Sequence, residues 1–331
     1  MKASGSQYQF PTVERVSQVK KENETKQIGS TSVKLNAFLE SNEFKESDAA
    51  LPIVLGMTDD GKPYITDLAT LPHLLIGGKT GYGKSICLNA LITSLLHKKL
   101  PDELKFVLFD PKVVDFLHFN SIENQYLAKL PGADPIVSDK DKVMPVLNSL
   151  LVEMDNRFCI LRDAKVRNVN EYNTLLKSGK LKSEASQKPL PYLVVIVDEL
   201  AVLMMENGSG VTKALSTLAI NGNTAGIHLI LATNYPSVLT VTGIIKALIP
   251  GRIAFKVDTE YDSRVLIDRP GAQDLVIPGE MIFVNTQARK HLQCSFISRE
   301  ELKALCDYIA SQPFTGTEPY LLPTPMENIK I

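Results

Sequence analysis

The feature that most constrains this 331-residue chain is a glycine-rich segment between an apolar run and a helical pattern. Residues Gly78–Ser85 read GKTGYGKS and satisfy the pattern G-x-x-x-x-G-K-[ST]. The apolar run His73–Ile76 predicts a buried strand before it, and Lys84–His97 predicts a helix after it. Backbone N–H groups of such a loop curl around a β-phosphate, and the helix N-terminus adds a positive field. A glycine-rich turn without a ligand is the simpler interpretation, but the flanking strand and helix favour a nucleotide site.

We therefore expect ATP to bind at this loop together with Mg²⁺. Lys84 would reach the β- and γ-phosphate oxygens, which gives it a catalytic role, and Ser85 would place its hydroxyl on the metal. The residues expected to contact the nucleotide are Gly78, Lys79, Thr80, Gly81, Tyr82, Gly83, Lys84, Ser85 and Ile86.

A second motif supplies carboxylates for the same chemistry. The four apolar residues Val194–Val197 precede Asp198 and Glu199 directly. Asp198 is expected to hold Mg²⁺ through its water shell, and Glu199 to orient the attacking water and take its proton. Adjacent carboxylates are also common at helix N-termini. The buried strand that precedes them favours the active-site interpretation.

A further apolar run, Ile227–Ala232, ends in Thr233 and Asn234. Ligands bind beyond the carboxyl ends of parallel strands, so the Asn234 side chain is predicted to sense the γ-phosphate. The alternative is a simple turn, because Asn234 and Tyr235 precede Pro236.

Apolar runs of four to six residues alternate with longer helical patterns from Leu51 onward, which predicts an α/β fold with a doubly wound, mostly parallel sheet. The expected strands are His73–Ile76, Lys105–Phe109, Tyr192–Val197, His228–Ala232 and Arg252–Val257. The expected helices are Lys84–His97, Lys142–Leu161, Val211–Asn221 and Arg299–Ala310. A small C-terminal β addition is expected from Glu280–Val284 and Leu292–Ile297.

The domain boundaries follow from changes in composition. Residues 1–50 are polar and charge-mixed and are predicted to form a short, partly flexible N-terminal arm. Residues 51–312 are predicted to form the ATPase domain. Residues 313–331 are rich in proline and are predicted to form a tail.

Composition excludes several classes of protein. With 44% hydrophobic residues the chain can bury a core, and 36 Lys plus Arg against 37 Asp plus Glu disfavours a broad basic face. The four cysteines are scattered without zinc spacing, which indicates free thiols. No apolar run approaches the roughly 20 residues of a membrane span, and the start of the chain lacks a signal-peptide pattern. We therefore expect a cytoplasmic protein without direct membrane insertion.

Seven segments in order carry a family resemblance. They read LPHLLIGGKTGYGKS, FVLFDPK, KVRNVNEYN, LPYLVVIVDELAVLMM, AGIHLILAT, PSVLTVTGIIKALIPGRIAF and YDSRVLID. From about Phe38 to Arg299 the chain resembles the motor domain of the FtsK/SpoIIIE DNA translocases. The resemblance implies a P-loop NTPase with a RecA-like fold, assembled as a hexameric ring through which double-stranded DNA passes.

The resemblance also implies DNA contacts. Lys246 in GIIKAL and Arg264 in DSR match basic positions that touch the DNA backbone in the family. A few cations per subunit, repeated around a ring, give many phosphate contacts without a basic composition. Tyr235 could grip either a base or a polypeptide.

Four positions depart from the family pattern. Asn234 and Tyr235 stand where the family has Gln-Arg before the proline, Asn223 stands at the arginine-finger position, and Glu260 stands at a sensor-lysine position.

Two hypotheses for the function follow. The first is an ATP-dependent double-stranded DNA translocase. The second is a nucleotide-binding ring subunit with weak or partner-activated hydrolysis that serves conjugation or secretion, with DNA or protein as cargo, because lost trans-acting cations remove transition-state stabilisation but leave ground-state binding.

Overall fold

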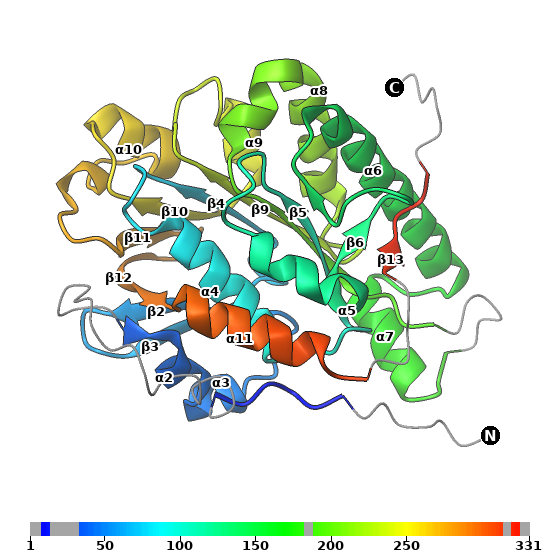
Figure 1. The fold of residues 1–331 in the computed structure, drawn as a ribbon. Coiled ribbons are helices and arrows are strands. Elements are labelled where there is room, and N and C mark those ends of the chain that lie inside the picture. The colour runs from blue at the N-terminus through cyan, green and yellow to red at the C-terminus, as the bar shows by residue number, and fades with distance from the viewer. Residues whose placement is uncertain (1–7, 14–32, 182–187, 314–318, 325–331) are drawn as a thin grey trace.

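The computed structural model describes residues 8–13, 33–181, 188–313 and 319–324 (Figure 1). Its centre is an 11-stranded sheet in the order β3-β2-β12-β11-β10-β4-β9-β8-β5-β7, with β1 paired to β12. A separate two-stranded sheet joins β13 to β6. The α/β fold with a large, mostly parallel sheet is therefore confirmed.

The parallel part of the sheet runs from β10 to β7, and each strand pairs in parallel with its neighbour. These strands are β4 (His73–Gly77), β5 (Leu104–Phe109), β7 (Ile136–Val137), β8 (Tyr192–Val197), β9 (Ile227–Thr233) and β10 (Gly251–Phe255). Every residue of β4, β5, β8 and β9 is buried. Burial on both faces explains why these strands read as continuous apolar runs.

An antiparallel extension completes the other edge of the sheet, where β11, β12, β2 and β3 follow β10. The strands of this extension and the short strands outside it are β1 (Val33–Lys34), β2 (Pro52–Thr58), β3 (Pro63–Asp67), β6 (Ala128–Lys129), β11 (Glu280–Val284), β12 (Arg289–Phe296) and β13 (Tyr320–Leu321). The predicted C-terminal β pair is β11 and β12, and β12 begins earlier than the predicted strand at Leu292.

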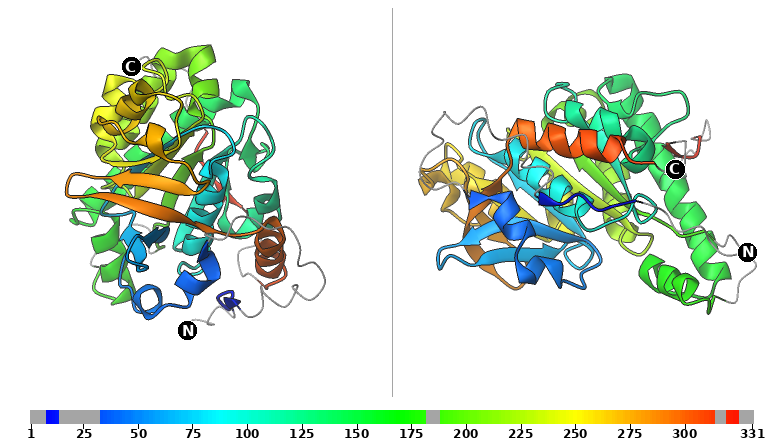
Figure 2. Two further views of the ribbon diagram at one scale, coloured as in Figure 1. Left: turned by 90° about the vertical axis from the view of Figure 1, so that its left-hand side faces the viewer. Right: turned by 60° about the horizontal axis from the view of Figure 1, so that its bottom comes forward.

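Helices cover both faces of the sheet (Figures 1 and 2). Side chains alternate along β8, so that Val194 and Ile196 pack with α4 and α11, whereas Val195 and Val197 pack with α6 and α8. Helices α9 and α10 share the second of these cores. The helices are α2 (Leu35–Leu39), α3 (Asn42–Lys45), α4 (Lys84–Leu96), η1 (Leu117–Ile122), α5 (Glu123–Tyr126), α6 (Lys140–Asp163), α7 (Val169–Lys177), α8 (Leu200–Asn221), α9 (Gly243–Leu248), α10 (Glu260–Ile267), η2 (Ala272–Asp274) and α11 (Arg299–Ala310).

The packed part of the chain begins before the predicted boundary at Leu51. Strand β1 pairs with β12, and α2 buries Leu35 and Phe38 in the core. These elements are too short to show a periodic pattern, so composition alone assigned them to a polar arm. Within the predicted tail, β13 pairs with β6, and Leu322 is buried. The arm before residue 33 lies outside the described residues, apart from 8–13.

Helix α8 starts eleven residues before the predicted Val211, because it follows β8 directly at Leu200. Asn207 interrupts it with φ −145° and ψ 60°. Gly208 and Gly210 lie beside this kink and have low helix propensity. In the described part of the chain, no helix is both long enough and apolar enough to cross a bilayer.

Two buried histidines join the starts of β4 and β9. His73 Nδ1 accepts the Leu229 N–H at 3.0 Å, and His73 Nε2 donates to the Ala219 carbonyl at 3.0 Å. His228 Nδ1 donates to the Pro72 carbonyl at 2.9 Å. Both side chains are buried, and this use of both His73 nitrogens requires a neutral ring.

We predict that the protein loses stability in mild acid. Burial lowers the pKa of His73, His97 and His228 to about 4, from an ordinary value of 6.5. Between these values the unfolded chain binds protons that the folded chain does not, so the free energy of unfolding falls as the pH drops from 6.5 toward 4, by on the order of 1–3 kcal/mol per imidazole. Urea unfolding at pH 5 and pH 7.5 measures this. His73→Gln, whose amide can make both hydrogen bonds without titrating, should lose less between the two pH values than the wild type, and an equal loss would contradict the assignment.

Candidate nucleotide-binding site

The phosphate loop leaves β4 at the carboxyl edge of the sheet and enters α4. Gly78 has φ +148° and donates its N–H to the Thr233 carbonyl at 3.3 Å. A Cβ at Gly78 would lie 2.7 Å from Phe255 Cβ, so only glycine fits between β4 and β10 here. Gly83 also has a positive φ, of 119°, and caps α4. The first N–H groups of α4 have no helical acceptor, which leaves them available for a phosphate.

Lys84 is buried beneath this loop. Its Nζ donates to the Gly78 carbonyl at 2.5 Å and to the Lys79 carbonyl at 2.9 Å. Burial lowers the pKa of Lys84 to about 8. The negative charges of Glu199 and Asp198 act in the opposite direction and raise this pKa, so both carboxylates lie within electrostatic range of the Lys84 ammonium. The ammonium is therefore held at the loop, as its predicted role requires.

The other predicted loop residues differ in exposure. Ser85 is half-buried in the first turn of α4, whereas Ile86 is exposed. Lys79 uses its N–H on the Lys256 carbonyl at 2.7 Å, and its Nζ pairs with Asp258 at 2.6 Å. The Lys79 side chain is thus engaged away from the loop centre.

Asp198 and Glu199 follow β8 at the same edge of the sheet. The Asp198 N–H donates to the Phe109 carbonyl at 3.0 Å, which extends the pairing of β8 with β5. Asp198 Oδ2 is buried and has no hydrogen-bond partner among the described residues. Burial, together with Asp115, raises the pKa of Asp198 to about 7. A buried carboxylate oxygen without a partner fits a site for a cation or its water shell.

Glu199 is fully buried and lies in a hydrogen-bonded cluster. Its Oε1 accepts from Thr233 Oγ1 at 2.8 Å, and its Oε2 accepts from Asn234 Nδ2 at 2.5 Å. The Asn234 N–H also donates to this carboxylate at 3.1 Å. Asn234 therefore contacts Glu199 directly. If Asn234 also contacts a phosphate, movement of its side chain would change the position of the Glu199 carboxylate.

Sequence reasoning assigned no role to two residues after β5. Asp110 is buried, and Lys112 Nζ lies 3.2 Å from Glu199 Oε2. The pattern that identified Asp198, a polar residue directly after an apolar run, also occurs at Asp110, which follows Phe106–Phe109. This pattern could have identified the turn that contains both residues. Lys112 is the last residue of the family segment FVLFDPK.

The residues predicted to bind DNA lie on α9, on α10 and after β9. Lys246 pairs with Asp268 at 2.6 Å and donates to the Arg264 carbonyl at 3.3 Å. Arg264 pairs with Glu260 at 2.6 Å, one helical turn away. Tyr235 is 65% exposed. Lys246 and Arg264 are thus close together, and each is paired with a carboxylate.

The positions that depart from the family pattern have local roles. Glu260 begins α10 and holds Arg264. Asn223 is exposed in the turn before β9, where its carbonyl accepts the Gly226 N–H at 3.1 Å. Arg252, on β10, donates to Asp268 and to the carbonyls of Ile249 and Lys246.

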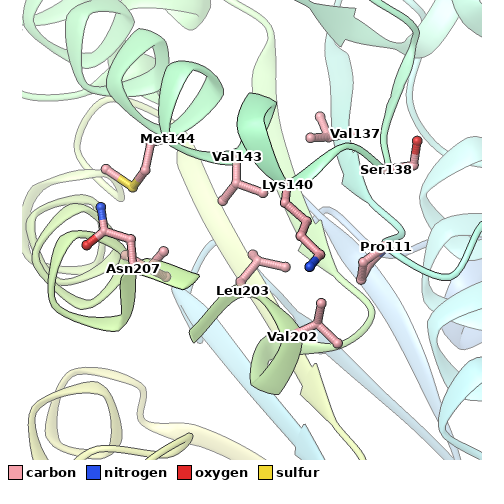
Figure 3. A pocket seen from close by; sticks show the side chains of 10 residues that line it. Pro111, Val137, Ser138, Lys140, Val143, Met144, Val202, Leu203 and Asn207 are labelled. Atoms are coloured by element: carbon pink, nitrogen blue, oxygen red, sulfur yellow. The ribbon is translucent and has the colours of Figure 1, made fainter. Parts of the chain in front are cut away.

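A small apolar pocket lies between the first turns of α6 and α8 (Figure 3). Its lining residues are Pro111, Val137, Ser138, Lys140, Val143, Met144, Val202, Leu203, Asn207 and Val211. Pro111 and Val202 place it next to Lys112 and Glu199 in sequence, but its lining does not include the phosphate loop. The pocket is therefore separate from the candidate nucleotide site.

Comparison with known proteins agrees with this geometry. The sequence model of the FtsK/SpoIIIE family matches residues 34–238. The DNA translocase FtsK of Chlorobaculum tepidum is 43% identical over 297 residues, which cover 88% of this chain and 36% of that protein. The chain belongs to the FtsK/SpoIIIE family. The DNA translocase SpoIIIE of Bacillus subtilis is 39% identical over 293 residues, with the same two coverages.

This FtsK/SpoIIIE family member spans about a third of the length of these curated relatives. Among solved structures, the cytoplasmic domain of the type VII secretion ATPase EccC of Thermomonospora curvata is similar, with a TM-score of 0.73 and 22% identity. The match covers 90% of this chain and 36% of that chain. It confirms the predicted P-loop ATPase fold.

We predict that two neighbouring lysines of the loop differ in their effect on nucleotide affinity. Lys84→Met removes the buried ammonium at the loop, so the Kd for a fluorescent ATP analogue should rise at least about tenfold, as expected for losing a charge-assisted contact. Lys79→Met removes a half-exposed ammonium that pairs with Asp258, so the Kd should change less than about threefold. Equal effects of the two substitutions would contradict the site described above. Equilibrium fluorescence titration measures both.

Proposed function

We propose that this chain is a motor that couples ATP hydrolysis to the movement of double-stranded DNA. The observation that carries the proposal is the buried Glu199 carboxylate, which lies beside Asp198 and within electrostatic range of Lys84. Curated relatives about 40% identical to this chain are named DNA translocases, which supports DNA as the cargo. The names favour translocation over the hypothesis of a conjugation or secretion subunit with weak hydrolysis.

Each residue of the site has a distinct task in this proposal. The loop from Gly78 to Ile86 would hold the phosphates of ATP, with Lys84 as the fixed cation. Ser85 and Asp198 would hold Mg²⁺, which when bound offsets the charge on the β- and γ-phosphate oxygens. Glu199 would take the proton of the attacking water on a carboxylate oxygen, and Asn234 would orient that carboxylate.

The proposal extends to an assembly. We infer a homo-oligomer, a hexameric ring in the cytoplasm, with duplex DNA in its pore. Lys246 and Arg264 would contact DNA phosphates, and Tyr235 would contact the DNA through its exposed ring. Because each cation is already paired in the free chain, a phosphate must compete with Asp268 or Glu260. DNA binding by this surface should therefore depend strongly on salt.

The central experiment is steady-state ATP hydrolysis with and without linear duplex DNA over a salt series. DNA should stimulate hydrolysis, and the stimulation should fade as the salt concentration rises. Lys84→Ala and Glu199→Gln should each lower kcat at least about 100-fold, because they remove the phosphate cation and the general base. If DNA leaves wild-type turnover at the Lys84→Ala background, the motor proposal is wrong for this chain, and a ring subunit activated by a partner is the better account.

A second prediction concerns Lys246. Replacing it by alanine should weaken DNA binding for all sequences alike and reduce the slope of log affinity against log salt by about one. Basal ATP hydrolysis without DNA should stay within about twofold of the wild type, since Lys246 pairs with Asp268 and contacts no residue of the phosphate loop among its described contacts. Fluorescence anisotropy with a labelled duplex checks the slope, and an unchanged slope would remove Lys246 from the interface.

A further inference from the structure

The turn after β5 brings a cation to the buried carboxylate of Glu199. Lys112 Nζ lies 3.2 Å from Glu199 Oε2; the Lys112 side chain is 42% exposed, whereas that of Glu199 is 0% exposed. Thr233 and Asn234 donate to the same carboxylate but are neutral. Among the described contacts of Glu199, Lys112 alone carries a positive charge. A carboxylate removed from water needs hydrogen bonds and a counter-charge, and Lys112 supplies the charge.

The backbone of this turn is ordered around Asp110. The buried Asp110 carboxylate accepts the N–H groups of the residues that follow it, at 2.9 to 3.2 Å. These donors are Lys112, Val114, Asp115 and Phe116. Val113 has a left-handed φ of 54°, which folds the turn back over the carboxylate. The Cα of Lys112 is therefore held at the edge of the site, and only its side-chain torsions remain free.

Pro111 belongs to the same turn. It lines the apolar pocket with Val202 and Leu203, which belong to the first turn of α8 (Figure 3). Glu199 directly precedes that helix. The turn after β5 and the start of α8 therefore border the same pocket, next to the ion pair of Lys112 and Glu199.

The two partners of this ion pair differ in exposure. An ion pair between two exposed side chains would contribute little, but here one partner is fully buried.

We propose that Lys112 is a positioning residue for Glu199, and that its ammonium holds the carboxylate in the orientation from which it accepts the proton of the attacking water. This inference rests on the proposed ATP hydrolysis. The alternative is an ion pair that stabilises the fold and has no part in turnover. The two differ in their effect on kcat at unchanged nucleotide affinity.

The test compares three variants of the whole chain. Lys112→Met keeps the length of the stem and removes the charge, Lys112→Arg keeps the charge, and Lys303→Met removes an exposed lysine that pairs with Asp307 on α11. In DNA-stimulated hydrolysis, Lys112→Met should lower kcat about 10- to 100-fold, with KM and the Kd for a fluorescent ATP analogue within about threefold of the wild type. Lys112→Arg should recover kcat to within about fivefold of the wild type, and Lys303→Met should match the wild type.

Two results would overturn the inference. Wild-type kcat in Lys112→Met would show that the ion pair has no part in turnover, and a Kd that rises as much as kcat falls would make Lys112 a phosphate ligand instead.

Urea unfolding of Lys112→Met, Glu199→Gln and the double variant measures the interaction free energy of Lys112 with Glu199. The substitution Lys112→Met should lower the free energy of unfolding more in the wild type than in the Glu199→Gln variant. A wild type that binds nucleotide without hydrolysing it contradicts the proposed function as well. A hydrolysing wild type with an unaffected Lys112→Met contradicts only the role of Lys112.

Discussion

Burial of the Glu199 carboxylate is the constraint on which the site depends. A carboxylate at 0% exposure is costly unless its oxygens are satisfied, and here the partners come from the ends of different strands. Thr233 ends β9, Asn234 follows it, and Lys112 follows β5. These strands flank β8 on its two sides, with Phe109 and Leu231 both in register with Val197. The strand order β9-β8-β5 is therefore what allows the Glu199 carboxylate to be buried with hydrogen-bond partners for both oxygens.

The parallel core could be predicted from the sequence because strands buried on both faces leave a continuous apolar signal, as in Tyr192–Val197. Arg299–Ala310 was predicted with the observed bounds, and in the structure a capping box of Ser298 and Glu301 forms its start. Val33–Lys45 was missed since elements of two to five residues carry no period of their own and are stabilised by contacts with β12 and the core. Asn207 shows the same limit within α8, where a kink follows from local geometry and packing.

The sequence predicted individual site residues at the ends of strands, but it did not predict which of these residues contact one another. Asp198, Glu199 and Asn234 were identified because each follows an apolar run. The contact of Asn234 with Glu199, and that of Lys112 with Glu199, require the order of the strands in the sheet. The carboxylate partners of Lys246 and Arg264 were also not predicted. Asp268 pairs with Lys246 because the end of α10 lies near α9 in the fold. Glu260 has a local explanation, as an i,i+4 partner of Arg264.

Asp268 holds two cations at once, Lys246 of α9 and Arg252 of β10. It also ends α10 in a left-handed conformation with φ 61°, so its carboxylate and its backbone serve different parts of the fold. If Lys246 exchanges this carboxylate for a phosphate, Asp268 keeps Arg252, and the end of α10 keeps its link to the strand beside the phosphate loop. Lys246 can therefore leave Asp268 for a DNA phosphate while the ion pair of Asp268 with Arg252 still connects α10 to β10. The shared carboxylate thus makes one exchangeable ion pair and one that stabilises the fold.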